Sequence, residues 1–412
     1  MPTPPGPVVD AKRELFITHV SVVDDPRALG AGPWSFGGLM TAMAPTDAGA
    51  AQFTKDWLAT WRTTTPVNTF SMDDRKVDKV IIRKWMARDG ATDFATWTPN
   101  FANAPFRLLG IVYRPDLVRF SGEQIVSAGE GRFVFEALNG PASDPASKSL
   151  RFTVIFEYGL VGNDQADVNA WAERFHALGG IPFGPAYNAA LQTVTDRFSG
   201  RGSNPAKPNG NALNQLRTNE VALGSPWQLR EFQIATTGAL AFTTVRQTPD
   251  LRANRQALSN WLNANAEAVK AQSARVPLDF NGEPLLSGRS DVRGNSPSFF
   301  WPTMSIADND VRHVFSLNTC NGCHNGETGN QRNTKSLFRH VSSRKVGQEA
   351  KLSGFLTGTT VRDPVSGVTR QFNDLAARTV ALQEALRPPT SPTAAETGPA
   401  LTVARSRRER TD

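Results

Sequence analysis

Apolar and polar positions alternate along the first two thirds of the chain in a way that predicts both strands and helices. Residues 14–24, "LFITHVSVVDD", show the β-branched alternation of a strand, while apolar residues recur at helical spacing in 48–63 and 75–90. A turn-rich connection, "NGPASDPASKS", is suited to joining two strands as a hairpin. The strands expected in this part of the chain span residues 14–24, 106–117, 131–138 and 150–161.

The pattern then becomes helical before it returns to strands. We expect helices over 166–180 and 185–200, a helical or irregular segment over 211–223, strands over 226–235 and 239–249, and a long amphipathic helix over 251–276. Consecutive strands with clustered helices favour an α+β domain with an antiparallel sheet over a doubly wound parallel sheet.

Changes of composition divide the chain. A Pro-rich linker is expected at 1–13, an α+β domain of unknown function at 14–280, and a linker rich in Gly, Pro and Ser at 281–303. A small, mostly helical domain is expected at 304–387, with a helix over 371–386 that Pro388 and Pro389 stop. The basic tail, 388–412, has the composition of a disordered segment.

Composition is ordinary for a globular protein, with 39% hydrophobic and 20% charged residues among 412. No apolar run is long enough to cross a membrane. The formal charge of +7 comes in part from the tail "ARSRRER", and no recognition motif accompanies it, so we expect no nucleic-acid partner.

The clearest chemical signal is "NTCNGCH", because the chain has only two cysteines and both lie here. Cys320 and Cys323, at i and i+3, share a helix face and can reach the two vinyl groups of one porphyrin, and His324 follows at i+4. This is a haem-attachment spacing. It predicts covalently attached haem c with His324 as the proximal iron ligand.

Three other interpretations of the motif remain open. Cys320 and Cys323 could bind zinc with His324 or His340, although the adjacency of Cys323 and His324 is awkward for tetrahedral chelation. A redox dithiol usually follows a strand, whereas these cysteines follow an expected helix. A disulfide would close a very small loop and stabilise little.

The segment "VRHVFSLNTCNGCHNGE" resembles the N-terminal helix and haem-binding loop of class I cytochromes c, and the resemblance covers residues 304–387. It implies thioether attachment at Cys320 and Cys323 and a proximal His324. The family usually supplies a distal methionine downstream, but no methionine follows the motif here. We expect His340 as the distal ligand, with His313 as second choice and a five-coordinate, open iron as the alternative. Ligation by two histidines lowers the reduction potential of the haem relative to ligation by histidine and methionine.

Other segments, "FRLLGIVYRPDL", "AGEGRFVFEAL", "FTVIFEYGL", "NQLRTNEVALGSPWQLREF" and "LSGFLTG", resemble an uncharacterised family of secreted proteins of Gram-negative bacteria. This resemblance implies export, so a periplasmic or extracellular location is expected although the given chain carries no signal peptide. A removed lipoprotein signal would leave room for membrane anchoring without a transmembrane segment.

Charged residues within the expected strands point to structure rather than catalysis. Arg132 is expected to pair with a Glu of a neighbouring strand. Arg–Glu pairing is also expected among Arg217, Glu220, Arg230 and Glu231.

The sequence therefore favours an exported monohaem c-type cytochrome that transfers electrons to a redox partner or binds a small ligand, fused to a large binding or docking domain. The alternatives are a haem enzyme of peroxidase or oxygenase type with an open iron, and a non-haem secreted binding protein whose CxxCH is structural or zinc-bound.

Overall fold

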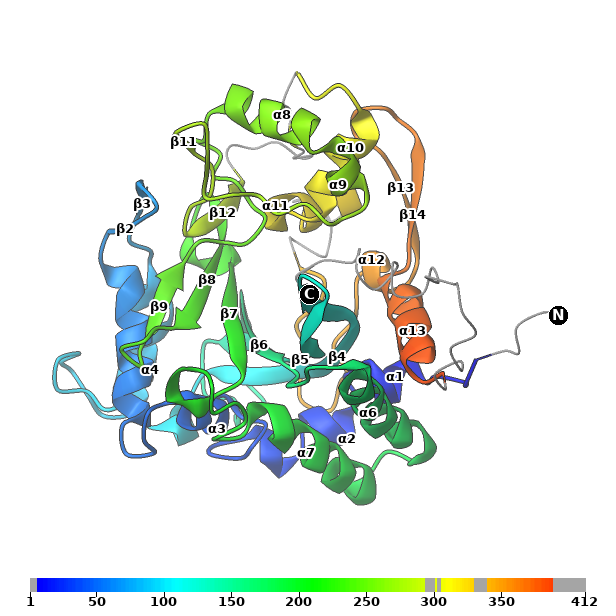
Figure 1. Cartoon of the computed structure of the whole chain (residues 1–412). Helices are drawn as coiled ribbons and strands as arrows, with labels where there is room; N and C mark the ends of the chain where they lie inside the picture. Colours follow the sequence, from blue (N-terminus) through cyan, green and yellow to red (C-terminus); the bar gives the residue numbers. More distant parts are fainter. Residues whose placement is uncertain (1–5, 293–300, 302–304, 330–338, 388–412) are drawn as a thin grey trace.

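A large, curved antiparallel sheet organises the computed structural model, which describes residues 6–292, 301, 305–329 and 339–387 (Figure 1). The sheet order is β1-β4-β5-β6-β7-β8-β12, and β9 pairs with the outer part of β8. Its strands are β1 (Phe16–Ile17), β4 (Phe106–Ser121), β5 (Gln124–Leu138), β6 (Ser149–Gly159), β7 (Leu213–Glu220), β8 (Trp227–Ile234), β9 (Leu240–Thr243) and β12 (Arg289–Val292). The mixed α and β architecture with an antiparallel sheet agrees with the expected class.

The two faces of the sheet differ in chemistry because side chains alternate along each strand. Leu108, Phe133 and Phe156 point to one face, where they join an extensive aromatic core. Leu109 and Val134 point to the opposite, concave face, which also carries buried arginines and glutamates. A bulge between Leu108 and Gly110 shifts the register of β4 against β5, so that Leu108 and Ile111, three positions apart, both join the aromatic core.

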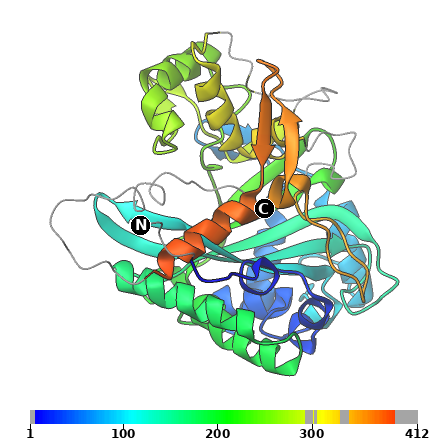
Figure 2. The ribbon, with the colours of Figure 1, turned by 90° about the vertical axis from the view of Figure 1, so that its right-hand side faces the viewer.

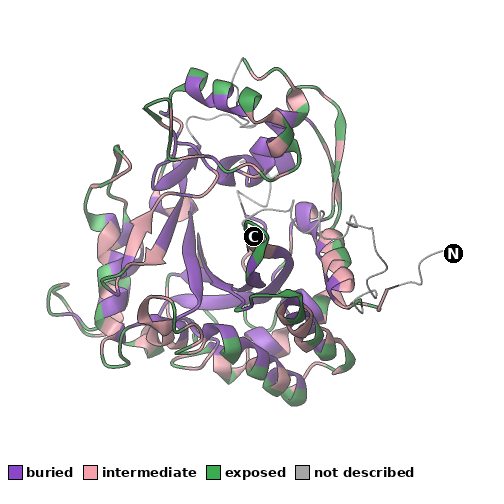
Figure 3. Ribbon diagram, viewed as in Figure 1, coloured by how far each residue is buried: buried purple, intermediate pink, exposed green. Residues whose placement is uncertain are grey.

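Helices cover the aromatic face. Phe36 on α3 stacks on Phe106 of β4 with ring centroids 4.0 Å apart, and Trp57 on α4 meets Phe232 of β8 edge-on at 6.1 Å. These packing helices are amphipathic, so their outer sides stay exposed (Figure 3). The helices that precede β7 in the chain are α1 (Ala11–Glu14), α2 (Val20–Val23), α3 (Phe36–Met43), α4 (Ala50–Ala59), α5 (Arg83–Arg88, preceded by a π-helix, Asp78–Ile82), α6 (Gln165–His176) and α7 (Pro185–Ser199).

The elements after β9 lie over the concave side and the edge of the sheet (Figures 1 and 2). Helix α13 packs against β4 and α6, and the hairpin β13–β14 extends from it toward α10 (Figure 2). The remaining helices are α8 (Arg255–Ala264), α9 (Ala266–Lys270), α10 (Asn309–Leu317), α11 (Cys320–Cys323), α12 (Gly354–Thr357) and α13 (Asp374–Ala385). Three two-stranded hairpins are formed by β2 (Thr65–Val67) with β3 (Phe70–Met72), β10 (Asp279–Phe280) with β11 (Glu283–Pro284), and β13 (Thr359–Arg362) with β14 (Thr369–Phe372).

Several expected elements need correction. Residues 14–24 form only the two-residue strand β1 followed by α2, which His19 caps through its Nδ1 atom. Residues 213–220, expected to be helical or irregular, form the buried strand β7. The long helix expected over 251–276 is split into α8 and α9 at Asn265.

Part of the segment expected to be a linker, residues 289–292, forms the edge strand β12. Most of 293–303 and the whole tail 388–412 lie outside the described residues. Among the helices of the described ranges, none combines the length and the apolar character that crossing a bilayer requires.

Candidate functional site

The CxxCH motif forms a single helical turn, α11, directly after α10. Thr319 caps this turn by accepting a hydrogen bond from the amide of Gly322 at 3.2 Å, and its hydroxyl also accepts from the indole of Trp301 at 2.9 Å. A Cβ at position 322 would lie 2.1 Å from the carbonyl oxygen of Ser316. The glycine of the motif therefore allows α10 and α11 to meet at close range.

The two cysteines are free thiols, and both are buried. Cys320 joins an apolar cluster with Trp227, Leu229 and Val245, and its amide donates to the hydroxyl of Thr248 at 2.9 Å. Burial raises the pKa of the Cys320 thiol to about 11, against a smaller lowering by Arg217. This thiol is therefore neutral at pH 7.

Cys323 faces a different set of residues from Cys320. It joins an apolar cluster on the concave side of the sheet with Leu109, Val134 and Phe355. Its Sγ lies 3.5 Å from Nε2 of His340. The two cysteine side chains thus pack in two separate apolar clusters, one at the β8–β12 edge of the sheet and one over β4–β6.

His324 and His340 lie against each other in the interior. Their ring centroids are 4.7 Å apart, and both residues are almost fully buried. Trp227 flanks His324 at 5.8 Å, and Phe355 flanks His340 at 4.8 Å. Nδ1 of His340 lies 2.9 Å from the hydroxyl of Ser353, which fixes the orientation of the ring.

The four residues singled out in the sequence, Cys320, Cys323, His324 and His340, therefore come together at one place. The neighbourhood of His324 and His340 could not be inferred from spacing alone, since sixteen positions separate them. His313, the second choice for a distal ligand, lies elsewhere, in the polar network described below.

Alternating charges line the concave face beside α11. Arg132 and Glu157 are register partners on β5 and β6, with Nη1 3.5 Å from Oε1, so the expected cross-strand pairing of Arg132 is confirmed. Arg217 on β7 contacts Glu157 at 2.9 Å and Glu231 on β8 at 3.0 Å. The expected pairing of Arg217 with Glu231 is thus also confirmed.

The arginine–glutamate ladder formed by Arg132, Glu157, Arg217 and Glu231 is buried. Buried ions have to be paired to be tolerated, and these four satisfy one another across strands β5–β8. The ladder has a structural explanation and needs no catalytic one.

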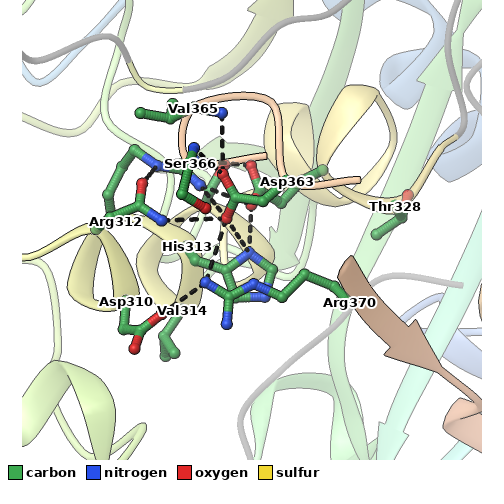
Figure 4. A network of polar contacts seen from close by, with 12 residues as sticks. Asp310, Arg312, His313, Val314, Thr328, Asp363, Val365, Ser366 and Arg370 are labelled. Atoms are coloured by element: carbon green, nitrogen blue, oxygen red, sulfur yellow. Dashed lines mark hydrogen bonds and ion pairs between the residues drawn. The ribbon is translucent and has the colours of Figure 1, made fainter. Parts of the chain in front are cut away.

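A second polar cluster joins α10 to the β13–β14 hairpin (Figure 4). Arg312 on α10 forms a bidentate contact with Glu327, at 2.9 and 3.1 Å, and reaches Asp363 at 2.9 Å. Nδ1 of His313 contacts the Glu327 carboxylate, and Arg370 contacts Asp363 at 3.3 Å. No sequence motif indicates this cluster, because its members are far apart along the chain.

Burial would raise the pKa values of these carboxyl groups, but their partners reverse the effect. Hydrogen bonds from His313 and Arg312 hold the pKa of Glu327 below its usual range. The amides of Ser366 and Val365, together with Arg312, hold the pKa of Asp363 well below its usual range. Both groups are therefore carboxylates at neutral pH.

The ligand atoms of His313, Glu327 and Asp363 lie within 4.8 Å of one another, a spacing that could hold a metal ion. However, Arg312 and Arg370 already balance the two carboxylates. A divalent cation would have to displace those guanidinium groups. We interpret the cluster as a charge-balanced lock that holds α10 to the hairpin.

Comparisons with known proteins add no further constraint, since no protein-family model, curated protein or solved structure matches the chain.

Proposed function

We propose that the chain is a c-type haem protein in which Cys320 and Cys323 hold the haem and His324 and His340 are the iron ligands. The observation that carries the proposal is the arrangement of the donor atoms: two paired imidazoles, with two thiols that face different clusters. Thioether bonds go to two different vinyl groups, so the sulfurs of a haem site need not converge.

A zinc site makes the opposite demand, because its ligand atoms must converge on one tetrahedral point. Within the described ranges, His313, Glu327 and Asp363 are the only three His, Cys, Asp or Glu residues whose ligand atoms all lie within 4.8 Å of one another. The motif residues do not form such a group. This difference favours haem over zinc at Cys320 and Cys323.

The residues fit the group in their chemistry. The apolar neighbours Trp227 and Phe355 would shield the two imidazoles from water, and Ser353 would hold His340 by its Nδ1 atom. Because His324 and His340 are in contact, a porphyrin between them would require the two rings to separate. Haem would supply a one-electron couple, and two imidazole ligands would place its potential below that of a His/Met site.

Electron transfer to a redox partner protein is the activity that we propose, at a periplasmic or extracellular location where the haem would be attached. The sheet and its helical layer would act as a docking body for the partner. A colourless protein would leave the alternative of a non-haem binding protein.

The test is expression in the periplasm together with a cytochrome c maturation system. We expect a red protein that keeps its haem on a denaturing gel, and a mass increase of one haem. Replacing both cysteines, Cys320→Ala and Cys323→Ala, should abolish the covalent attachment. A colourless wild-type protein under these conditions would refute the proposal.

The distal ligand is tested by the ferric spectrum. His340→Ala should convert a low-spin spectrum to a high-spin one, because an open coordination position remains. His176→Ala is the matched control, since that partly exposed imidazole is bound to Glu14 at 2.8 Å and should leave the spectrum unchanged. A low-spin spectrum that persists in His340→Ala would exclude His340, and a high-spin wild type would favour the open-iron enzyme.

A further inference from the structure

A cavity of about 370 Å³ lies beside the C-terminal end of β4, and three arginines line it. They are Arg119 on β4, Arg246 after β9 and Arg275 after α9, and Glu130 and Gln247 complete the polar lining. The remaining walls are apolar, from leucine, valine and phenylalanine side chains of β4 and of the segments near 276 and 286. The volume lies within the range of small-molecule sites.

The side chains that line the cavity include three arginines and one carboxylate, Glu130, so the lining has a positive balance. Glu130 is bound by Arg132 at 2.8 Å and by the side-chain amide of Asn214 at 3.1 Å. Glu231, which lies 3.5 Å from Nε of Arg246, is shared with Arg217 at 3.0 Å. Each acidic group is thus already engaged by an arginine of the ladder.

Lys207 lies close to the same charged side chains. Burial lowers the pKa of Lys207 to about 8, and the charges of Arg119 and Arg246 add to this shift while Glu130 opposes it. Its ammonium group donates to the backbone oxygens of Ala212 and Leu213 at 3.1 Å and to the side-chain oxygen of Asn214 at 2.7 Å.

The backbone at the cavity is strained in a defined way. Gln247 has a φ of +60°, which non-glycine residues rarely adopt, and such strain gathers at ligand sites. Its side-chain oxygen accepts a hydrogen bond from the amide of Val276 at 3.0 Å and so joins the two walls. The next residue, Thr248, accepts from the amide of Cys320 at 2.9 Å, which links the cavity to the CxxCH turn.

We infer that this cavity binds a small organic carboxylate whose apolar body lies against the apolar walls. Guanidinium groups match a carboxylate in shape and can bind it through two parallel hydrogen bonds. The mixed lining suits an aliphatic or aromatic acid better than an inorganic anion. The inference rests on the cavity and its charge, and it holds whether or not haem is attached at Cys320 and Cys323.

The experiment is calorimetric titration of the full-length protein with hexanoate, benzoate, the neutral benzamide and inorganic phosphate. We expect both carboxylates to bind, benzamide to bind at least tenfold more weakly, and phosphate to bind more weakly than hexanoate. Raising the salt concentration should weaken the binding, because exposed charges are screened. Absence of carboxylate binding at about 10 mM, or equal binding of phosphate and hexanoate, would overturn the inference.

Substitution then locates the site. Arg275→Gln should weaken carboxylate binding by tenfold or more, and because Arg275 is exposed the protein should keep its thermal midpoint. Arg119→Gln serves as a second variant among the lining residues. Arg83→Gln, an exposed arginine on α5 that does not line the cavity, is the matched control. Equal affinities in Arg275→Gln, Arg119→Gln and Arg83→Gln would place the ligand elsewhere and refute the assignment.

Discussion

The lock around Arg312 should be among the most sensitive points of the chain, because it holds both flanks of the CxxCH turn. Arg312 on α10, which precedes α11, contacts Asp363 of the hairpin (Figure 4). Its other partner, Glu327, follows α11. The change Arg312→Met keeps an unbranched apolar stem and removes the guanidinium group. Two buried carboxylates would then lose their shared counter-charge.

The magnitude follows from the contacts that are lost and those that remain. Removing one partner of a buried ion pair typically destabilises by about 3–5 kcal/mol. His313 would still contact Glu327, and Arg370 would still contact Asp363, so we expect the lower end, about 3 kcal/mol. An unfolding entropy of about 2.1 cal/mol/K per residue gives about 0.9 kcal/mol/K for 412 residues, and hence a fall of roughly 3–4 °C in the thermal midpoint.

A double-mutant cycle in scanning calorimetry tests the reasoning. Glu327→Gln alone should also destabilise, but the double variant should lose less than the sum of the two by at least about 1 kcal/mol, because the partners are coupled. Lys270→Met, which removes exposed pairs with Glu267 and Asp308, is the control and should change stability by less than about 1 kcal/mol. Additivity within about 0.5 kcal/mol would show that Arg312 and Glu327 do not act as a pair.

Two further predictions concern stability. The pKa of Asp363 is depressed in the folded state, so this group contributes stability above its unfolded pKa, and that contribution is lost as the pH falls below about 4 toward the folded value. Asp363→Asn should therefore lower the thermal midpoint at pH 7 and flatten the decline of the midpoint between pH 5 and pH 3. An unchanged slope would contradict this role of Asp363. Phe36→Ala should destabilise the protein by about 3–5 kcal/mol in urea titration, because Phe36 is buried against Phe106, Trp57 and Phe135. A loss below about 1 kcal/mol would mean that the neighbouring side chains fill the space left by the Phe36 ring.

Long apolar strands could be predicted from the sequence, whereas the alternation over 14–24 was misleading and a strand dominated by polar residues was missed. The expected strands over 106–117 and 150–161 correspond to β4 and β6, which are rich in apolar residues and bury apolar side chains on both faces. Strand β7, "LNQLRTNE", is buried although it is mostly polar, because its concave-facing residues are paired with charges on neighbouring strands. The sequence indicated Arg–Glu pairing in this region, but it did not indicate that 213–220 lies as a strand between β6 and β8.

The site was predicted in part for a similar reason. The spacing of Cys320, Cys323 and His324 is local, so the sequence alone indicated that they lie in one helical turn. The contact of His324 with His340 depends on how the chain returns to the sheet, and His340 could be selected only because no methionine follows the motif. The cluster of His313, Glu327 and Asp363 had no such indication, since its members come from three separate elements.

The chemistry of the concave face explains why the motif and the sheet are physically coupled. Leu109, Val134 and Ile155 of the sheet share one apolar cluster with Cys323 and Phe355, so the segments that carry the motif residues bury the surface of the sheet. The arginine–glutamate ladder lies on the same face, where ions tolerate burial only as long as their pairing is kept. Any displacement of α11 would therefore expose apolar strands and hydrate the ladder together. A group attached at Cys323 would have the β4–β6 face as its direct neighbour, which is a physical reason for joining the motif to a large sheet.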